Sequence, residues 1–196
     1  MNRIITLSFL LFVSSFSVCY GEDENKQADD YLDIDKSLSA YASNAGDANT
    51  LGDMLHTGFG APKNISQAIM WYEVAAKAGH AGAQNSLGDI YYNGDGVEQN
   101  YKLAFSWYEK SAMKGNTTAQ SNLAYMYLNG ESIKVDYSKA KYWFEKAVAK
   151  GDVAAQYLLG TMYAEAKGVE KSSVRAKELF TLSCSQGSTF ACARLK

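Results

Sequence analysis

Apolar residues recur along this chain at helical spacing, in short segments separated by turns. In the segment 81–93, Ala83, Leu87 and Tyr91 are four residues apart, so they share one face of a predicted helix. The next segment has apolar or small residues at steps of three and four, at Ala104, Trp107, Tyr108, Ser111 and Ala112. Its lysines and glutamate lie mainly off that face. The pattern predicts a pair of antiparallel amphipathic helices with small residues where the two backbones approach.

The same pattern returns after 36 residues. Leucine keeps this interval at Leu51, Leu87, Leu123 and Leu159. The tryptophans occupy one register, with Leu179 in the fourth place: Trp71, Trp107 and Trp143. Glycine ends each second helix, at Gly79, Gly115, Gly151 and Gly187. One hairpin alone cannot bury its apolar stripe, so such repeats stack. We therefore predict an all-α fold, a right-handed α-solenoid of stacked antiparallel helix pairs.

The turn within each pair first suggests an ion-binding loop, since one copy reads NGDG between Asn93 and Gly96. Asp95 corresponds to Phe59, Glu131 and Lys167 in the other copies, so the repeat does not require an acid there. Glycine is what persists, at Gly58, Gly94 and Gly130, and again at Gly60, Gly96 and Gly168. Glycine serves where a backbone adopts positive φ after a helix. We interpret the stretch as a turn and predict no metal site.

The stretch LGDIYYNGDGVEQNYKLAFSWYEKSAMKG resembles the Sel-one-like repeat (SLR), a relative of the tetratricopeptide repeat, and the resemblance extends from Ala45 to the C-terminus. It implies an interaction scaffold without catalysis or cofactor. The expected repeats are 45–80, 81–116, 117–152 and 153–187, followed by a capping helix at 188–196. The terminal repeats depart from the family pattern at Asp47, Leu55 and Leu179.

The first residues predict export. An arginine precedes an apolar run from Ile4 to Val18, too short for a comfortable membrane span, and an acidic segment follows. We predict a signal peptide at 1–21, then an acidic segment and capping helix at 22–44. The mature protein would be periplasmic or secreted, without stable membrane insertion. Cys19 leaves lipid attachment open, although Val18 before it is bulky for such a site. A formal net charge of −2 argues against nucleic-acid binding.

Two cysteines, Cys184 and Cys192, remain after signal removal. An even count in an exported protein favours a disulfide, which would staple the C-terminal cap. The spacing also resembles bacterial secreted cysteine-rich (Hcp-type) repeat proteins. Those carry a bridge in every repeat, so the resemblance is to a distant cousin.

That second resemblance raises an enzymatic alternative, because some cysteine-rich relatives are described as penicillin-binding or β-lactamase-like. Ser-x-x-Lys occurs at Ser111–Lys114 and Ser138–Lys141. The repeat explains both serines, as a packing position and a helix start, and no companion motif is present. His56 and His80 have no ligand partners at metal-binding spacing. A secreted effector, or the partner of one, is a third possibility.

The first helix of each repeat should line the concave side, where repeat proteins usually bind extended partners. Carboxylates, amides and tyrosines on these helices are expected to point away from the packing face and suit a protein or peptide partner. The predicted binding residues are Asn49, Asp53, Asn85, Asp89, Tyr92, Tyr125 and Tyr157. An alternative is that the acids and amides only confer solubility and the tyrosines are half-packed against neighbouring repeats.

Overall fold

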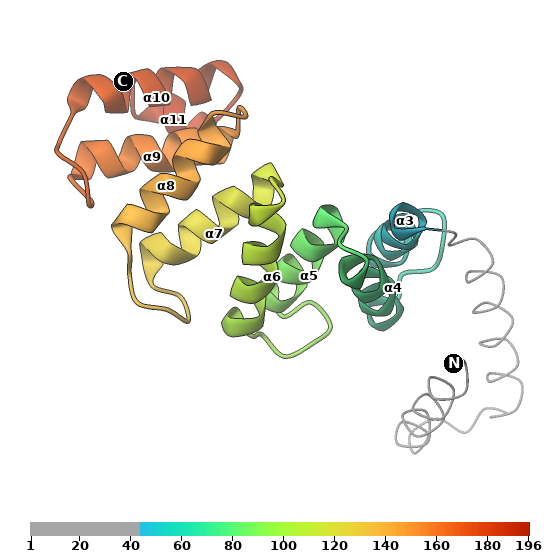
Figure 1. Cartoon of the computed structure of the whole chain (residues 1–196). Coiled ribbons are helices and arrows are strands. Elements are labelled where there is room, and N and C mark those ends of the chain that lie inside the picture. Colours follow the sequence, from blue (N-terminus) through green and yellow to red (C-terminus); the bar gives the residue numbers. More distant parts are fainter. Residues whose placement is uncertain (1–43) are drawn as a thin grey trace, which may run out of the picture. The chain divides into compact units, whose positions relative to one another are not determined.

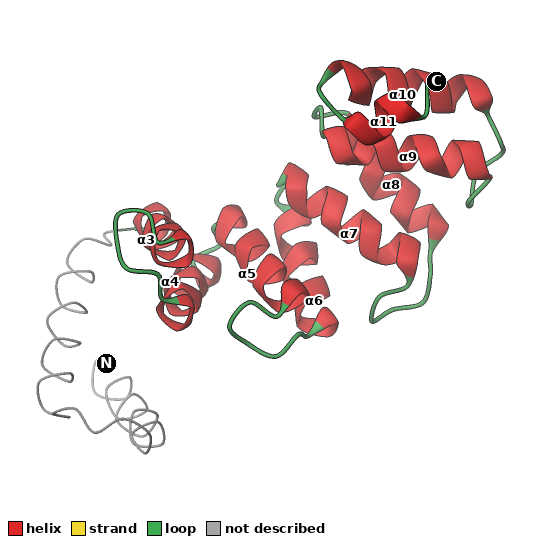
Figure 2. Ribbon diagram, turned by 180° about the vertical axis from the view of Figure 1, so that it is seen from behind, coloured by secondary structure: helices red, strands yellow, loops and turns green. Residues whose placement is uncertain are grey.

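The computed structural model describes residues 44–196, where all regular elements are helices (Figures 1 and 2). They are α3 (Ala45–Thr57), α4 (Ile65–Lys77), α5 (Ala81–Asn93), α6 (Tyr101–Met113), α7 (Thr117–Asn129), α8 (Tyr137–Val148), α9 (Val153–Glu165), α10 (Ser173–Ser185) and α11 (Thr189–Ala193). Consecutive helices pack as pairs, which confirms the predicted all-α solenoid. The predicted signal peptide and the segment 22–43 lie outside the described residues. None of the helices in this described region combines the length and the apolar character that a membrane span requires.

Each helix begins at a polar residue whose side chain accepts a hydrogen bond from a backbone N–H of the first turn, which satisfies a donor that has no partner within the helix. The N-caps of α3, α5, α7 and α9 are Asn44, His80, Asn116 and Asp152. Those of α4, α6, α8 and α10 are Asn64, Asn100, Asp136 and Ser172. His80, expected near a helix end, accepts through Nδ1 from the Ala83 N–H at 3.2 Å. Because these N-caps recur at the same position of each repeat, the helices of every pair begin at equivalent residues.

The turn within each pair depends on left-handed backbone. The residue after each first helix has positive φ, and in three pairs it is a glycine: Gly58, Gly94 and Gly130. In the fourth pair it is Ala166, with φ of 57°. A second left-handed position follows two residues later in each turn. It is a glycine in three pairs, but in the third pair it is Ser132, with φ of 65°. Within 44–196 these two are the non-glycine residues with positive φ. The NGDG segment is therefore one of four equivalent turns.

An aromatic ring fills the space between the two helices of each pair. In the second pair, Tyr108 of α6 lies against Gly88 of α5, and a Cβ added to Gly88 would lie 2.5 Å from the ring. Tyr72 and Phe180 lie in the same way against Gly52 and Gly160. Buried alanines of the second helices surround these rings, at Ala68, Ala104, Ala112, Ala140 and Ala176. Small residues thus set a close helix separation, as the sequence predicted.

Buried glutamines join successive pairs. The Gln84 amide donates to the Ala76 carbonyl at 3.1 Å, and the Gln120 amide donates to the Ala112 carbonyl at 3.2 Å. First helices also meet directly, since α3 contacts α5 and α5 contacts α7. Side-by-side first helices form the inner side of a solenoid of this kind. We call this layer, α3, α5, α7 and α9, the first-helix face.

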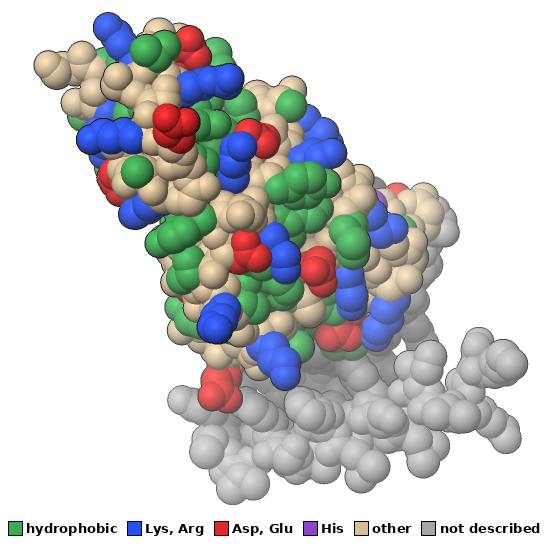
Figure 3. Space-filling model, turned by 60° about the vertical axis from the view of Figure 1, so that its left-hand side comes forward, with side chains coloured by type: hydrophobic (Ala, Val, Ile, Leu, Met, Phe, Trp, Pro, Cys, Tyr) green, Lys and Arg blue, Asp and Glu red, His purple; other side chains and the backbone are tan. Residues whose placement is uncertain are grey.

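The C-terminal end is closed by α11. A disulfide joins Cys184 of α10 to Cys192 of α11, with their Cα atoms 4.8 Å apart. Ala191 is buried beside Phe180, so α11 covers apolar surface that the last pair would otherwise expose. Figure 3 shows one face of the molecule, on which lysine and arginine side chains are interspersed with acidic and hydrophobic ones.

Candidate partner-binding site

Helix α5 presents two polar residues beside its buried stripe. Ala83, Leu87 and Ile90 are buried, whereas Asn85 and Asp89, one turn apart, are only partly buried. Two of the buried positions are four residues apart, as are the two polar positions, so each set follows one side of the helix. The helix therefore orients an amide and a carboxylate together along the first-helix face.

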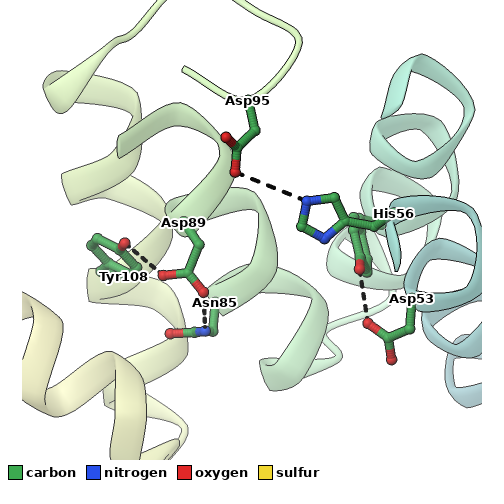
Figure 4. Close-up of polar contacts among 7 residues, drawn as sticks. Asp53, His56, Asn85, Asp89, Asp95 and Tyr108 are labelled. Carbon is green, nitrogen blue, oxygen red and sulfur yellow. Dashed lines mark hydrogen bonds and ion pairs between the residues drawn. The ribbon is translucent and has the colours of Figure 1, made fainter. Parts of the chain in front are cut away.

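Asp89 is held by three hydrogen bonds from three helices. The Tyr108 hydroxyl donates to Oδ1 at 2.7 Å, and the Asn85 amide donates to Oδ2 at 2.8 Å (Figure 4). The Asn122 amide of α7 donates to Oδ1 at 3.1 Å. Asn122 also lies 3.5 Å from the Asn85 oxygen. The carboxylate is thus fixed in orientation, and its bond to Asn122 links the second and third repeats.

Burial changes the acid–base properties of this cluster. Desolvation raises the pKa of Asp89 above its ordinary value, although hydrogen bonds from Tyr108 and Asn85 act in the opposite direction. Burial, followed by the Asp89 charge, raises the pKa of Tyr108. The hydroxyl therefore stays protonated and donates a hydrogen bond to the carboxylate. Asp89 is a charged group that is incompletely solvated.

A pocket of about 370 Å³ lies over Asp89, between α5 and α7. Its lining consists of Asp89, Tyr92, Asn93, Tyr108, Asn122 and Tyr125. The Tyr92 ring packs against Tyr101 and Tyr108, at centroid distances of 5.2 and 6.3 Å. Tyr125 remains 37% exposed. The pocket has a carboxylate and two amides on tyrosine walls, and its volume lies within the range of small-ligand sites.

Glu131, in the turn after α7, is bonded to one of the residues that line this pocket. Its Oε1 accepts a hydrogen bond from the Tyr92 hydroxyl at 3.1 Å. Its Oε2 is buried and has no hydrogen-bond partner within the described residues. Burial, and then this carboxylate, raise the pKa of Tyr92. A second acid therefore fixes the Tyr92 side chain in the pocket wall.

The first repeat has a simpler version of the arrangement. The Tyr72 hydroxyl donates to Asp53 at 2.8 Å, and the Asn49 amide donates to the other Asp53 oxygen at 2.8 Å. Asp53 is exposed. His56, between the two clusters, has its Nε2 3.9 Å from a carboxylate oxygen of Asp95 (Figure 4).

Tyr157 lies in different surroundings. Its ring packs against Phe180 of α10 and Phe190 of α11, with centroids 5.8 and 6.2 Å away. It belongs to the C-terminal cluster closed by the disulfide. The structure thus brings together Asn85, Asp89, Tyr92 and Tyr125, places Asn49 and Asp53 in a separate pair, and leaves Tyr157 apart from both.

Sequence reasoning missed Tyr108, Asn122 and Glu131. Helical spacing placed Tyr108 in the core, where its ring does lie, but its hydroxyl extends to the pocket. The internal copies contain a usable signal, because tyrosine at this position coincides with aspartate at the Asp89 position. Tyr72 pairs with Asp53 in this way. No comparable signal identifies Asn122, whose partners belong to another repeat.

Within residues 44–196, no group of three or more histidine, cysteine or acidic side chains is arranged to hold a metal ion. The acids around the pocket are instead bound to tyrosine hydroxyls and amides.

Solved structures with the same fold are similar to this chain. One is a protective antigen present in uropathogenic Escherichia coli strains, which displays an SLR fold. Its sequence is 35% identical and the TM-score is 0.76; the match covers 82% of this chain and 35% of the antigen chain. A Sel1 repeat protein from Oxalobacter formigenes is 32% identical, with a TM-score of 0.73 over 78% of this chain and 62% of its own. This chain therefore spans less than two thirds of either protein.

Helicobacter pylori cysteine rich protein B is 27% identical, with a TM-score of 0.53, over 68% of this chain and 96% of its own. No curated protein sequence matches the chain significantly. The Sel1 repeat profile matches residues 48–80, 81–116, 117–152 and 153–188. These matches cover most of the helical region, and the chain belongs to the Sel1 repeat family.

Proposed function

We propose that this protein is an exported, non-catalytic scaffold that binds another protein or a peptide through its first-helix face. The observation that carries the proposal is the pocket between α5 and α7, where Asp89 is only partly buried and Tyr125 is exposed. Sel1 repeats form helical scaffolds that typically mediate protein–protein interactions. Half-exposed tyrosines and fixed polar groups are common in such interfaces because they combine contact area with hydrogen bonding.

Export is supported by two features of the chain. The apolar N-terminal run followed by an acidic segment has the pattern of a signal peptide. The Cys184–Cys192 disulfide is of a kind that persists in oxidising compartments. Secretion to the medium or retention in a periplasm would both meet this requirement.

The environment of Ser111 favours a scaffold over a serine enzyme. Ser111, the serine of one Ser-x-x-Lys motif, is fully buried, and its hydroxyl donates to the Ala81 carbonyl at 2.6 Å. Ser183, one repeat further, is also buried and donates to the Val153 carbonyl at 2.9 Å. A nucleophile must reach its substrate and transfer its proton to a base. The two serines instead hold the second helix of one pair against the first.

A crosslinking pull-down tests the proposal. The wild-type chain and an Asp89→Lys/Tyr92→Ala variant are incubated with a secreted or periplasmic extract, and crosslinked proteins are identified by mass spectrometry. We expect a partner that the wild type captures and the variant loses.

A matched control carries the same charge change on a second helix. Glu145 and Tyr142 are exposed on α8, so Glu145→Lys/Tyr142→Ala should retain the partner. Loss of the partner from both variants, or from neither, would contradict binding through the first-helix face. Labelling of the protein by a fluorescent penicillin, abolished by Ser138→Ala, would instead support an enzyme.

A further inference from the structure

Within the four helix pairs, basic residues are confined to the second helices, whereas acids occur in both layers. The first helices contain no lysine or arginine, and their acids are Asp47, Asp53, Asp89 and Glu165. The basic residues of the paired helices all lie on second helices: Lys77, Lys102, Lys110, Lys139, Lys141, Lys146, Arg175 and Lys177. Although the whole chain is nearly neutral, the first-helix face therefore carries negative charge, which attracts and orients cationic groups.

The pocket over Asp89 lies on this face, between α5 and α7. It is lined by a fixed carboxylate and by the rings of Tyr92 and Tyr125, and the Tyr92 hydroxyl donates to a second carboxylate, Glu131. No lysine or arginine lines it. Carboxylates bind ammonium and guanidinium groups through charge-assisted hydrogen bonds, and tyrosine rings attract the same groups through their faces.

We propose that this pocket receives a lysine or arginine side chain from an extended segment of the protein partner. The inference rests on the proposed scaffold function and adds the chemistry of the partner. Asp89 would pair with the cation, the tyrosine walls would contact its aliphatic stem and charged head, and Asn93 and Asn122 would bind the neighbouring peptide backbone.

Comparison of the first two repeats supports this assignment. Asp53 accepts hydrogen bonds from a tyrosine and an asparagine in the same way as Asp89, but Asp53 is exposed, whereas Asp89 is partly buried and lines the pocket. The partial burial that raises the pKa of Asp89 also means that its charge is incompletely solvated. A cation bound there would compensate this charge in the complex. The second repeat, rather than acidity in general, is therefore the expected site.

Peptide titration tests the proposal directly. The probes are three seven-residue Gly-Ser peptides whose central residue is lysine, arginine or citrulline, an uncharged isostere of arginine. Binding to the ¹⁵N-labelled full chain is followed by amide chemical shifts. We expect shifts in α5 and α7 and an affinity for the lysine and arginine peptides about ten-fold higher than for the citrulline peptide.

Two substitutions with equal charge change locate the binding site. Asp89→Asn keeps the side-chain shape and should weaken binding of the arginine peptide about ten-fold, whereas Asp53→Asn should change it less than about two-fold. Tyr125→Leu, at a half-exposed position, should weaken it roughly three-fold while leaving citrulline binding unchanged. Urea unfolding of each variant verifies that the fold is kept.

Equal loss in Asp89→Asn and Asp53→Asn would show diffuse electrostatic attraction and overturn the pocket assignment. Equal affinity for citrulline and arginine peptides would exclude recognition of a cation. If no peptide binds, the pocket is not a lysine or arginine site. The scaffold proposal is tested separately, because the pull-down variants report on any partner of the first-helix face whatever its charge.

Discussion

The first two repeats and the last two use the same architecture with different chemistry at one position. In repeats 1 and 2 the ring between the helices is a tyrosine, Tyr72 or Tyr108, whose hydroxyl donates to an aspartate on the first helix. In repeats 3 and 4 the ring is a phenylalanine, and the aspartate positions are occupied by Tyr125 and Thr161. Packing requires the ring alone, whereas the hydroxyl and the carboxylate occur together.

This difference separates what the fold needs from what a binding face needs. Phe144 is fully buried and leaves no hydroxyl to satisfy, so an apolar ring is sufficient for the core. The ring of Tyr108 is buried in the same way, but its hydroxyl donates a hydrogen bond to Asp89 and so orients this carboxylate on the first-helix face. The N-terminal half is thus polar on that face, and the C-terminal half is closed by aromatic contacts and a disulfide.

The largest expected effect comes from adding a methyl group where a first-helix glycine meets the aromatic ring, once in each half of the molecule. A Cβ at Gly88 would lie 2.5 Å from Tyr108, whose ring is held by Asp89. Gly88→Ala should lower the free energy of unfolding by about 2 kcal/mol in urea titrations. At Gly160 the Cβ would lie 2.8 Å from Phe180, a ring without such a bond. Gly160→Ala should cost less than about 1 kcal/mol, and equal losses would show that the hydroxyl does not restrain the ring.

The second-largest effect on stability is expected from exchanging tyrosine and phenylalanine between the helices of repeats 2 and 3. Tyr108→Phe removes one of the three hydrogen bonds to Asp89, the one from the buried tyrosine hydroxyl, and should cost about 1 to 1.5 kcal/mol. Phe144→Tyr should cost a similar amount, because its buried hydroxyl would lack a carboxylate. Adding Tyr125→Asp to Phe144→Tyr should recover most of that loss. Thermal and urea unfolding measure the coupling, and simple additivity of the two changes would refute the idea that these residues act as a pair.

The turns also differ between the halves. Repeats 1 and 2 have glycine at both left-handed positions, whereas repeat 3 has Ser132 at one and repeat 4 has Ala166 at the other. Ser132→Gly and Ala166→Gly should each raise the free energy of unfolding by about 0.5 to 1 kcal/mol, since glycine adopts positive φ without strain. Gly94→Ala should lower it, and its φ of 77° makes it the matched control. A loss of stability on introducing either glycine would contradict this reading of the turns.

The smallest effect concerns pH and the two aspartates. Because burial raises the folded-state pKa of Asp89 above its ordinary value of 3.8, the charged form is disfavoured on folding. Its favourable contribution is therefore fully present below the ordinary pKa and is lost as pH rises through the raised pKa. His56 lowers this pKa and Asp95 raises it, as lesser influences. Asp89→Asn should be more stable than wild type at pH 7, and the difference should vanish below pH 3.8. A difference that grows as pH falls would contradict this sign.

Sequence periodicity was sufficient to predict the helix pairs and their turns. The same local geometry recurs in every repeat, and it requires a buried leucine at the Leu87 position and glycine in most of the turns. It was less informative about the candidate site. Spacing placed Asp89, Tyr92 and Tyr125 on the first helices, but their convergence in one pocket depends on how repeats stack. Tyr157 fits the same pattern, yet it packs against Phe190 of α11, an element that follows the last pair and has no counterpart inside the repeats.

Site-specific photocrosslinking tests the central claim most directly. A photoreactive phenylalanine derivative replaces either Tyr125 of α7, 37% exposed, or Tyr142 of α8, 51% exposed, so that each helix layer of one repeat carries the probe. Binding through the first-helix face predicts that the captured partner is crosslinked from position 125 and not from 142, and that Asp89→Asn reduces the yield at 125. Crosslinking from position 142 with little or none from 125 would contradict it and place the partner on the second helices.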